Sequence, residues 1–393
     1  MDANATTPLA PEVFAAMRPW FTERFGNASS IHFHGQRARG AVERAREQVA
    51  RLLGCRPAEV VFTSGGTEGD NLALCGLLKP GDHLITSSIE HHAVLTTAER
   101  LRDRGVEVTF VGVDTSGVVD PAEVRRALRP NTQLISVMMA NNEIGTVQPV
   151  AEIGAIAQEA DVYFHTDAVQ AVGKLPIDVT AIGCDLLTIS GHKFHGPQGT
   201  GALYVRKGTH PEPLLFGGPQ ERQRRAGTEN LPGIVGLGVA AEMAHAFVEG
   251  DGPKRLAVLR DRLERGMLAR VDESGVYGGD VARVPNTTNI WFDYLEGEAL
   301  VIALDLKGLA VSGGSACQSG ASSPSHVLSA LGAVPGRAGA SLRFSLDTSA
   351  TDRDVDFALE VVPAAVARLR ELSPFYKPPV KAPAAGEPAG SAI

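Results

Sequence analysis

Short apolar runs of strand length alternate with stretches of helical periodicity through the first 250 residues of the chain. The strand-like runs lie at 60–63, 83–86, 106–111, 133–139, 162–166, 185–189 and 201–205. Helical spacing of apolar residues fits 35–53, 67–78, 92–104, 121–128 and 150–159. This alternation predicts an α/β fold in which helices cover both faces of a mostly parallel, seven-stranded sheet. Ligands bind such sheets beyond the carboxyl ends of the strands.

The pattern changes after residue 250. Helical stretches at 232–247 and 255–271 precede apolar runs at 287–292, 309–312 and 340–346, which predict a smaller α+β unit. We therefore expect a large domain over residues 14–250 and a small domain formed by 1–13 and 251–372. Residues 373–393 are rich in Pro and Ala and lack apolar periodicity, so we expect a disordered tail.

Composition narrows the classes of partner. The chain has 393 residues, 37 basic against 45 acidic, and no basic block that would follow a phosphate backbone, so we expect no direct nucleic-acid partner. It has no signal-peptide pattern and no uninterrupted apolar run near 18 residues, so we expect a cytoplasmic protein without a membrane span. Its four cysteines form no disulfide framework and no Cys-x-x-Cys zinc motif, and we expect no metal.

Two short segments carry the reactive groups. Lys193 ends the sequence Ser-Gly-His-Lys directly after the apolar run 184–189, where desolvation would lower the pKa of its amine, as Schiff-base chemistry requires. Cys317 lies among Gly and Ser in 312–320, which predicts an exposed thiol. The other three cysteines have apolar neighbours and are expected to be buried. An amine and a thiol together suggest an enzyme that holds an amino acid on pyridoxal 5'-phosphate and attacks it with a thiolate.

Polar residues at strand ends fit such a cofactor. The sequence Ser-Gly-Gly-Thr-Glu at 64–68 follows a strand and opens a helix, where backbone N–H groups and Thr67 can meet a phosphate; a tight turn is the alternative. Ser190 and His192, beside the lysine, have side chains that can reach the same phosphate. Asp167 ends an apolar strand and can pair with a protonated ring nitrogen, although a helix N-cap explains it too.

Further candidates lie on the same side of the predicted sheet. Gln170, one turn after Asp167, can donate to the ring oxygen or lie on the surface. His91 stands at a strand-to-helix junction, where it can stack on the ring or carry a proton. Asn142, in a polar turn at 141–145, can hold the cofactor or a substrate carboxylate. Arg343 is a charge inside an alternating strand and has the planar fork that matches a carboxylate.

These motifs together resemble those of the cysteine desulfurases, which are class V aminotransferase-like enzymes of PLP fold type I. The resemblance runs in order from residue 2 to about residue 370. It rests on Asp-Ala-Asn-Ala-Thr-Thr-Pro at 2–8, Gly-Gly-Thr-Glu at 65–68, Glu-His at 90–91, Asn-Asn-Glu-Ile-Gly at 141–145, Asp-Ala-Val-Gln at 167–170, Ser-Gly-His-Lys at 190–193, Arg-Arg-Ala-Gly-Thr at 224–228 and the segment around Cys317. The number of residues between Cys317 and Arg343 is similar to that in the branch of the family with a long, mobile cysteine loop.

The resemblance implies a role for each residue. Lys193 carries the cofactor, Asp167 pairs with the ring nitrogen, and His91 stacks on the ring. The remaining cofactor contacts are Gly66, Thr67, Asn142, Gln170, Ser190 and His192, with Thr228 reaching the phosphate across a homodimer. Arg343 and Asn142 bind the substrate carboxylate. Cys317 takes sulfur from L-cysteine as a persulfide, leaving alanine, and passes it to an acceptor such as an iron–sulfur scaffold or a tRNA-thiolation protein.

The chain departs from the usual pattern without losing a reactive group. Gly66 stands where alanine is usual, Ala28 where proline is usual, and Gln318 where threonine is usual. Two other interpretations stay open from the residues. One is a selenocysteine lyase or an aminotransferase of the same fold, in which Cys317 has no role. The other is a catalytically silent partner-binding scaffold, which the presence of both Lys193 and Cys317 disfavours.

Overall fold

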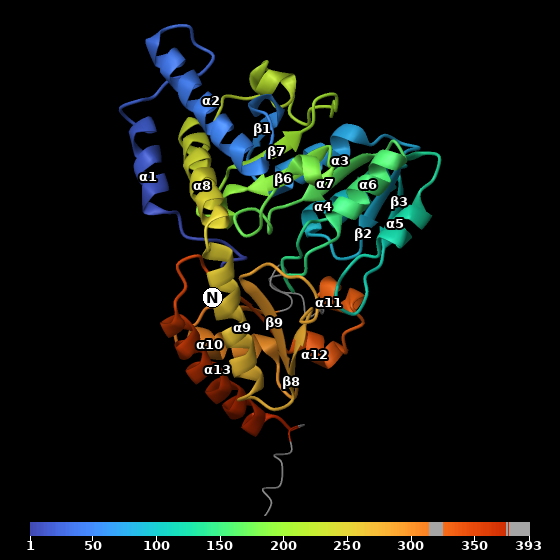
Figure 1. Ribbon diagram of the computed structural model, residues 1–393, viewed down its shortest axis with the longest axis vertical. Helices are drawn as coiled ribbons and strands as arrows, with labels where there is room; N and C mark the ends of the chain where they lie inside the picture. Colours follow the sequence, from blue (N-terminus) through green and yellow to red (C-terminus); the bar gives the residue numbers. More distant parts are fainter. Residues whose placement is uncertain (314–324, 375, 377–393) are drawn as a thin grey trace, which may run out of the picture.

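The computed structural model describes residues 1–313, 325–374 and 376. A seven-stranded sheet with the order β1-β7-β6-β5-β4-β2-β3 forms its larger part (Figure 1). The strands are β1 (Val60–Thr63), β2 (His83–Ser87), β3 (Glu107–Val111), β4 (Thr132–Ser136), β5 (Tyr163–Asp167), β6 (Leu186–Ser190) and β7 (Gly201–Val205). β7 is antiparallel to both of its neighbours and the other pairs are parallel, which confirms the predicted fold class.

Neighbouring residues of a strand point to opposite faces of the sheet, and β1, β2, β6 and β7 are buried on both faces. Val60 and Phe62 face the core that includes α2 (Phe33–Leu53) and α8 (Leu231–Glu249). Val61 faces the opposite core, with α3 (Gly66–Leu77) and α4 (His92–Asp103). Three shorter helices also belong to the larger part: α5 (Pro121–Ala127), α6 (Val150–Glu159) and α7 (Val179–Ile182).

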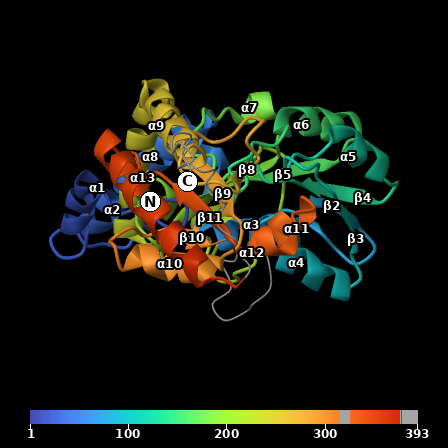
Figure 2. The same ribbon diagram turned by 90° about the horizontal axis from the view of Figure 1, so that it is seen from below.

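A second, antiparallel sheet forms the smaller part, with the order β10-β11-β9-β8. Its strands are β8 (Ser274–Tyr277), β9 (Thr287–Phe292), β10 (Ser312–Gly313) and β11 (Ser341–Ser345). The helices α9 (Gly252–Leu268), α10 (Gly297–Asp305) and α13 (Asp352–Leu372) contribute to its core around Phe292 and Phe344. Two short helices, α11 (His326–Ala330) and α12 (Pro335–Gly339), lie on the side of α4, as Figure 2 shows for α11.

The first residues of the chain join the two sheets. Ala3 N donates to Ser345 O at 3.0 Å, and Ser345 N donates to Met1 O at 3.0 Å, so the chain starts beside β11. Thr7 N then donates to His192 O at 2.9 Å, directly after β6. The helix α1 (Pro11–Met17) follows and packs on α8. Residues 2–7 therefore lie at the junction of both sheets.

Most predicted elements occur within a few residues of their expected bounds, with informative differences. The run 133–139 is a regular strand only to Ser136, although Val137 N and Met139 N still donate to the carbonyl groups of His165 and Asp167. Only the last residue of the run 309–312 is in a strand, β10. Helix α8 is the one helix of the described residues that is long and apolar enough for a membrane span, and it packs against α1 and α2 in the larger core.

Candidate active site

A cavity of about 230 Å³ lies beyond the carboxyl ends of β5 and β6, at the N-terminal ends of α3 and α4. It brings together nine of the residues singled out in the sequence: Gly66, Thr67, His91, Asn142, Asp167, Gln170, Ser190, His192 and Lys193. Asp70, Met138 and Val169 complete its lining. The strand ends of a parallel sheet meet at one edge, so residues spread over 128 positions of the chain converge.

Lys193 reaches the cavity from the short 3-10 turn Gly191–Lys193, which follows β6 without a gap. Its Nζ donates to two backbone oxygens of the N-terminal segment, Asn4 O at 2.7 Å and Ala5 O at 2.8 Å. The lysine amine therefore lies where the first residues of the chain cross the site.

Asp167 is the acid of the cavity. It ends β5, is 5% exposed, and accepts from Val169 N at 2.9 Å through Oδ1. Burial raises its pKa to about 6. Asp70 on α3 is a second buried acid whose pKa burial and the charge of Asp167 raise well above its usual range. Its Oδ1 accepts no hydrogen bond from the residues that the structure describes, and it lies 3.5 Å from His165 Nε2. A cation beside Asp167 would offset the cost of burying these acids together.

The other end of the cavity suits an anion. Helix α3 begins at Gly66, and its first backbone N–H groups have no partner within the helix. A methyl group built on Gly66 would lie 2.9 Å from Val169 Cγ2 and 3.6 Å from Ser190 Cβ, so glycine lets the helix start lie close to the floor of the cavity. His192 Nδ1 lies 3.1 Å from Thr6 Oγ1, and its pKa is lowered to about 4 by burial and by Lys193.

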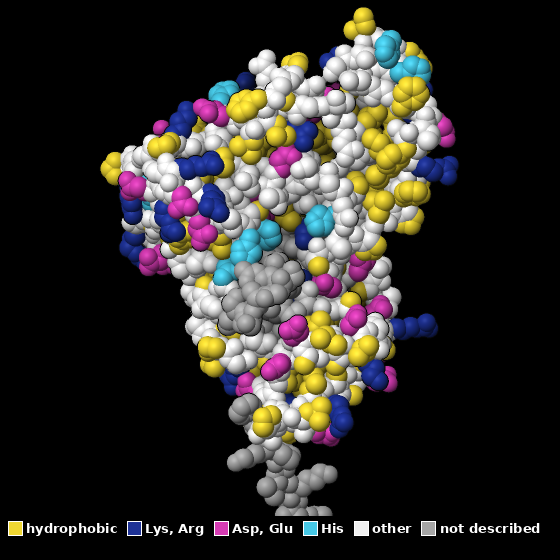
Figure 3. All heavy atoms as spheres, turned by 180° about the vertical axis from the view of Figure 1, so that it is seen from behind, with side chains coloured by type: hydrophobic (Ala, Val, Ile, Leu, Met, Phe, Trp, Pro, Cys, Tyr) yellow, Lys and Arg dark blue, Asp and Glu magenta, His cyan; other side chains and the backbone are white. Residues whose placement is uncertain are grey.

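His91 is the N-cap residue of α4, and its Nδ1 accepts from Ala93 N at 3.1 Å. Burial and the neighbouring charge of Lys193 lower its pKa to about 4, so the ring is neutral at physiological pH. His92 follows it, and the His92 and His326 rings lie 4.8 Å apart, which brings α11 to the same rim. Histidine side chains gather there between the two parts of the molecule (Figure 3).

Arg343 lies in β11 and is 4% exposed, outside the group that lines the cavity. Its Nη1 donates to Asn142 O at 2.9 Å, and its Nη2 donates to Asp2 Oδ1 at 2.9 Å and to Ser312 Oγ at 3.1 Å. Its Nε is buried without a partner among the described residues. The backbone of Asn142 therefore links this guanidinium to the cavity, and Nε keeps an unused donor.

Cys317 lies outside the described residues. The described residues before and after its segment lie near Arg343 and Glu143. Ser312 pairs with Arg343 in the small sheet, and Ser325 Oγ donates to Glu143 Oε2 at 2.5 Å. Burial raises the pKa of Glu143, next to Asn142, to about 7. The described residues on either side of position 317, Ser312 and Ser325, therefore contact residues at the rim of the site.

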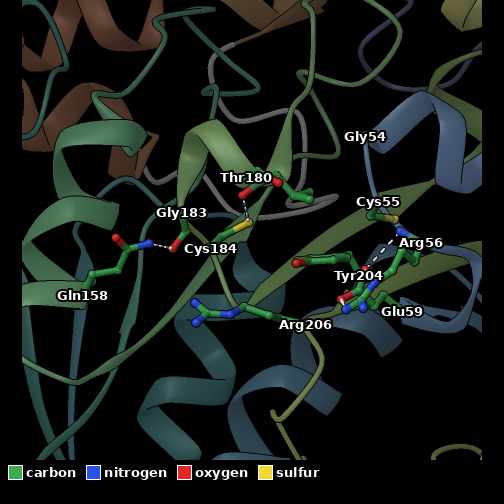
Figure 4. Close-up of a pocket in the computed structure, with 11 residues that line it drawn as sticks. Gly54, Cys55, Arg56, Glu59, Gln158, Thr180, Gly183, Cys184, Tyr204 and Arg206 are labelled. Carbon is green, nitrogen blue, oxygen red and sulfur yellow. Dashed lines mark hydrogen bonds and ion pairs between the residues drawn. The ribbon is translucent and has the colours of Figure 1, made fainter.

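The other three cysteines are poor nucleophiles. Burial raises the pKa of Cys55 to about 12, and it raises the pKa of Cys75 and Cys184 as well. Cys55 and Cys184 line a different cavity of about 630 Å³ at the opposite edge of the large sheet (Figure 4). Its cations are already paired, Arg206 with Asp185 at 3.2 Å and Arg56 with Glu59. That cavity offers no reactive thiol.

Thr228 does not reach the cavity within its own chain. It is exposed in the loop 217–230 and is not among the residues that line the cavity. The loop is held to the large sheet by Glu221, which pairs with Arg46 at 2.8 Å, while Arg225 pairs with Glu68 on α3 at 2.9 Å.

Sequence reasoning missed three polar residues at the site: Asn4, Asp70 and Lys174. Asn4 Nδ2 donates to Thr287 Oγ1 at 2.9 Å and to Asn142 O at 3.2 Å, so it joins both sheets. Lys174 is buried behind Gln170. A charge at helical spacing among apolar residues was the available signal for Asp70, and a lysine inside the apolar stretch 168–175 was the signal for Lys174.

Comparison with known proteins agrees with this geometry. The model of the family described as "Aminotransferase class-V" matches residues 1–357. The chain is 52% identical over 379 residues to the cysteine desulfurase IscS of Methanosarcina thermophila, covering 95% of this chain and 93% of that protein. It is 48% identical over 380 residues to the cysteine desulfurase IscS of Dictyoglomus turgidum, covering 95% and 96%.

Solved structures agree as well. A NifS-like protein superposes with a TM-score of 0.88 at 36% identity, covering 94% of this chain and 99% of that one. The structure described as SspA in complex with cysteine superposes with a TM-score of 0.78 at 39% identity, covering 88% and 97%. The chain therefore belongs to the class-V aminotransferase family, and within it this enzyme is a cysteine desulfurase.

Proposed function

We propose that this cysteine desulfurase works with pyridoxal 5'-phosphate held in the 230 Å³ cavity. The observation that carries the proposal is the convergence of three groups on one cavity: the amine of Lys193, the buried acid Asp167, and the anion-binding end of α3. The orphaned Asp70 Oδ1 and the raised pKa of Asp167 fit a site completed by a cationic ring nitrogen. Glycine at 66 lets the start of α3 lie close to Val169 and Ser190, beside the proposed phosphate site.

Each residue then has a definite task. Thr67, Ser190 and His192 would hold the phosphate with the helix end, Gln170 would donate to the ring hydroxyl, and Asn142 would hold the cofactor or the substrate carboxylate. When bound, the cofactor supplies the electron sink that makes the substrate Cα proton removable. The Lys193 amine takes that proton and returns it, and the neutral His91 ring covers the site from the α4 side. Arg343 binds the substrate carboxylate through its fork, where Nε has an unused donor.

Cys317 is proposed as the nucleophile for the sulfur step. Its thiolate attacks the substrate sulfur, so that an S–S bond forms while the carbon–sulfur bond breaks. A proton replaces sulfur on carbon, and one L-cysteine plus one protein thiol become alanine plus one persulfide, with atoms and electrons balanced. The attachment of its segment beside Arg343 and Glu143 supports this assignment.

A homodimer belongs to the same proposal. Apolar side chains are exposed on the face formed by α1, the connection after it, and the start of α2, where Figure 3 shows hydrophobic side chains together. They are Phe14, Phe21, Phe25, Ile31 and Phe33, between 54% and 92% exposed. The exposed Thr228 would serve the phosphate of a partner subunit. We infer that the persulfide passes in the cytoplasm to an acceptor such as an iron–sulfur scaffold or a tRNA-thiolation protein.

The test is to mix the protein, loaded with pyridoxal 5'-phosphate, with L-cysteine and a thiol reductant and to measure alanine and sulfide. Equal yields are expected. Cys317→Ser should keep the visible band of the bound cofactor and lose sulfide release, and Lys193→Ala should lose turnover by at least about 10³-fold. Cys75→Ser is the matched control. Sulfide from the Cys317→Ser variant would refute the role of Cys317, and an amino-group transfer to pyruvate would instead support an aminotransferase.

A further inference from the structure

Lys174 is a buried lysine for which the chemistry described above has no use. It is 5% exposed, and within the described part of the chain no carboxylate lies at ion-pair distance from it. Burial and the charges of Lys193 and Arg343 hold its pKa well below the usual range. Burying an amine without a carboxylate partner lowers the stability of the fold. We therefore expect a role of Lys174 in the contacts that it makes.

Its two hydrogen bonds indicate that role. Lys174 Nζ donates to Gln170 Oε1 at 2.7 Å and to Asn4 Oδ1 at 2.9 Å. A lysine amine that donates to an amide must face the oxygen end, so each contact fixes which way the amide is turned. Gln170 Nε2 is thereby directed to the other side, where it donates to Asn4 O at 3.0 Å.

The same carbonyl, Asn4 O, accepts from Lys193 Nζ at 2.7 Å. Asn4 is itself fixed at its side chain, because Oδ1 accepts from Asn286 Nδ2 at 3.1 Å and Nδ2 donates to Thr287 Oγ1 at 2.9 Å. Lys174 thus contacts the side chains of both Gln170 and Asn4; the Asn4 carbonyl accepts from Lys193, and Gln170 and Lys193 both line the cavity.

We propose that Lys174 is a positioning residue, which orients the Gln170 and Asn4 amides so that Gln170 presents its N–H end to the cofactor site. This inference rests on the proposed function, because it assigns Gln170 to the cofactor. Lys174 does not line the cavity with the cofactor residues, so it acts through Gln170 rather than by contact.

A double-mutant cycle tests the proposal through cofactor affinity. Apoprotein of the wild type, Lys174→Met, Gln170→Met and the double variant is titrated with pyridoxal 5'-phosphate, and the dissociation constant is read from protein fluorescence. Each single change is expected to weaken cofactor binding about tenfold. The double change should weaken it no further, because both single changes disrupt the same Lys174–Gln170 contact. Wild-type affinity in Lys174→Met, or effects that multiply, would overturn the proposal. Lys79→Met, at an exposed lysine, is the matched control.

A second variant tests the contact between Lys174 and Gln170 in the absence of cofactor. It keeps the proposal testable even if Lys174→Met does not fold. Gln170→Glu places a carboxylate opposite Lys174, so the apoprotein melting temperature should stay within about 2 °C of wild type, because the new ion pair offsets burial. A fall of more than about 6 °C would mean an unpaired buried carboxylate and would contradict the contact. If the cofactor assignment itself is wrong, the wild type will not bind pyridoxal 5'-phosphate, while this melting result still stands.

Discussion

Glu90 is a buried acid beside the site that makes the stability of the folded protein depend on pH. Its side chain is fully buried; Oε1 accepts from Ser87 Oγ at 2.6 Å and from Met138 N at 2.8 Å, while Oε2 has no partner among the described residues. Burial, with the charge of Asp167, raises its pKa to about 8. The folded protein therefore binds a proton here that the unfolded chain releases near pH 4.5, so this group's stabilisation is lost as pH rises from 4.5 through 8.

Glu90→Gln should remove this pH dependence, because the amide oxygen keeps both contacts and the other end is neutral. A difference of one unit between the folded and unfolded pKa corresponds to about 1.4 kcal/mol in the free energy of unfolding. A change of about 1 kcal/mol moves the melting temperature of a domain of about 150–250 residues by about 2–4 °C. We expect the gain in melting temperature over wild type to be several degrees larger at pH 8 than at pH 5, measured by calorimetry of the apoprotein. Glu99→Gln, exposed on α4, should show no such difference. An equal gain at both pH values would contradict the prediction.

At the scale of elements, the loop 217–230 depends on one buried ion pair. Arg46 of α2 donates to both oxygens of Glu221 at 2.8 Å, and Phe62 N of β1 donates to Glu221 Oε2 at 2.9 Å. Glu221, Arg222 and Gln223 all have left-handed backbone conformations, with φ between 47° and 67°. Such a backbone costs free energy in non-glycine residues, so the ion pair holds the loop in a conformation that it would not adopt alone.

Breaking this pair should destabilise the protein strongly. Arg46→Met leaves a buried carboxylate without its cation, and we expect a loss of about 3–5 kcal/mol in the free energy of unfolding. Adding Glu221→Gln removes the unpaired charge and should recover part of that loss. Denaturant unfolding measures both, with Lys79→Met in an exposed ion pair as a control that stays within about 0.5 kcal/mol. A loss no larger than that of the control would show that the pair does not hold the loop.

Sequence periodicity predicted the elements of the large sheet because most of its strands are buried on both faces. Val60–Thr63 and Gly201–Val205 have the predicted bounds, and helix α6 has them too. Strand β8 escaped prediction because Ser274–Tyr277 is only half-buried and contains a glycine. At the site, residues at strand ends were predictable, since parallel strands end at one edge. Asn4 and Lys174 were not, because their partners are brought near only by the meeting of the two sheets.

At the scale of the whole molecule, the exposed apolar face is the clearest sign of assembly. Phe21 and Phe25 are each 61% exposed in the connection between α1 and α2. A change of both to Glu should place charge at the centre of a dimer contact, so light scattering with size-exclusion chromatography should give the 41.3 kDa mass of one chain in place of two. Cofactor affinity should fall as well if a partner supplies Thr228.

Leu306→Glu is the matched control for this pair of changes, because Leu306 is 82% exposed at the end of α10 in the smaller part. It should leave the mass and the affinity as in the wild type. A wild-type protein that already has the mass of one chain would refute the dimer, and a double variant that keeps the mass of two would place the contact elsewhere.

The N-terminal segment has a consequence for how the enzyme is made. Asp2 meets Arg343 across 341 positions, and Asn4 meets Thr287 across 283, so these two partners are synthesised long after the N-terminal segment. At about 5–20 residues per second, a ribosome needs on the order of 20–70 s to bridge that interval. By then the larger sheet can pair its own strands and the N-terminal segment can contact Lys174 and His192, but Asp2 and the Asn4 side chain still lack their partners in the smaller sheet. The N-terminal segment is therefore held at both of its ends, by Arg343 and by His192, only after β11 has been synthesised.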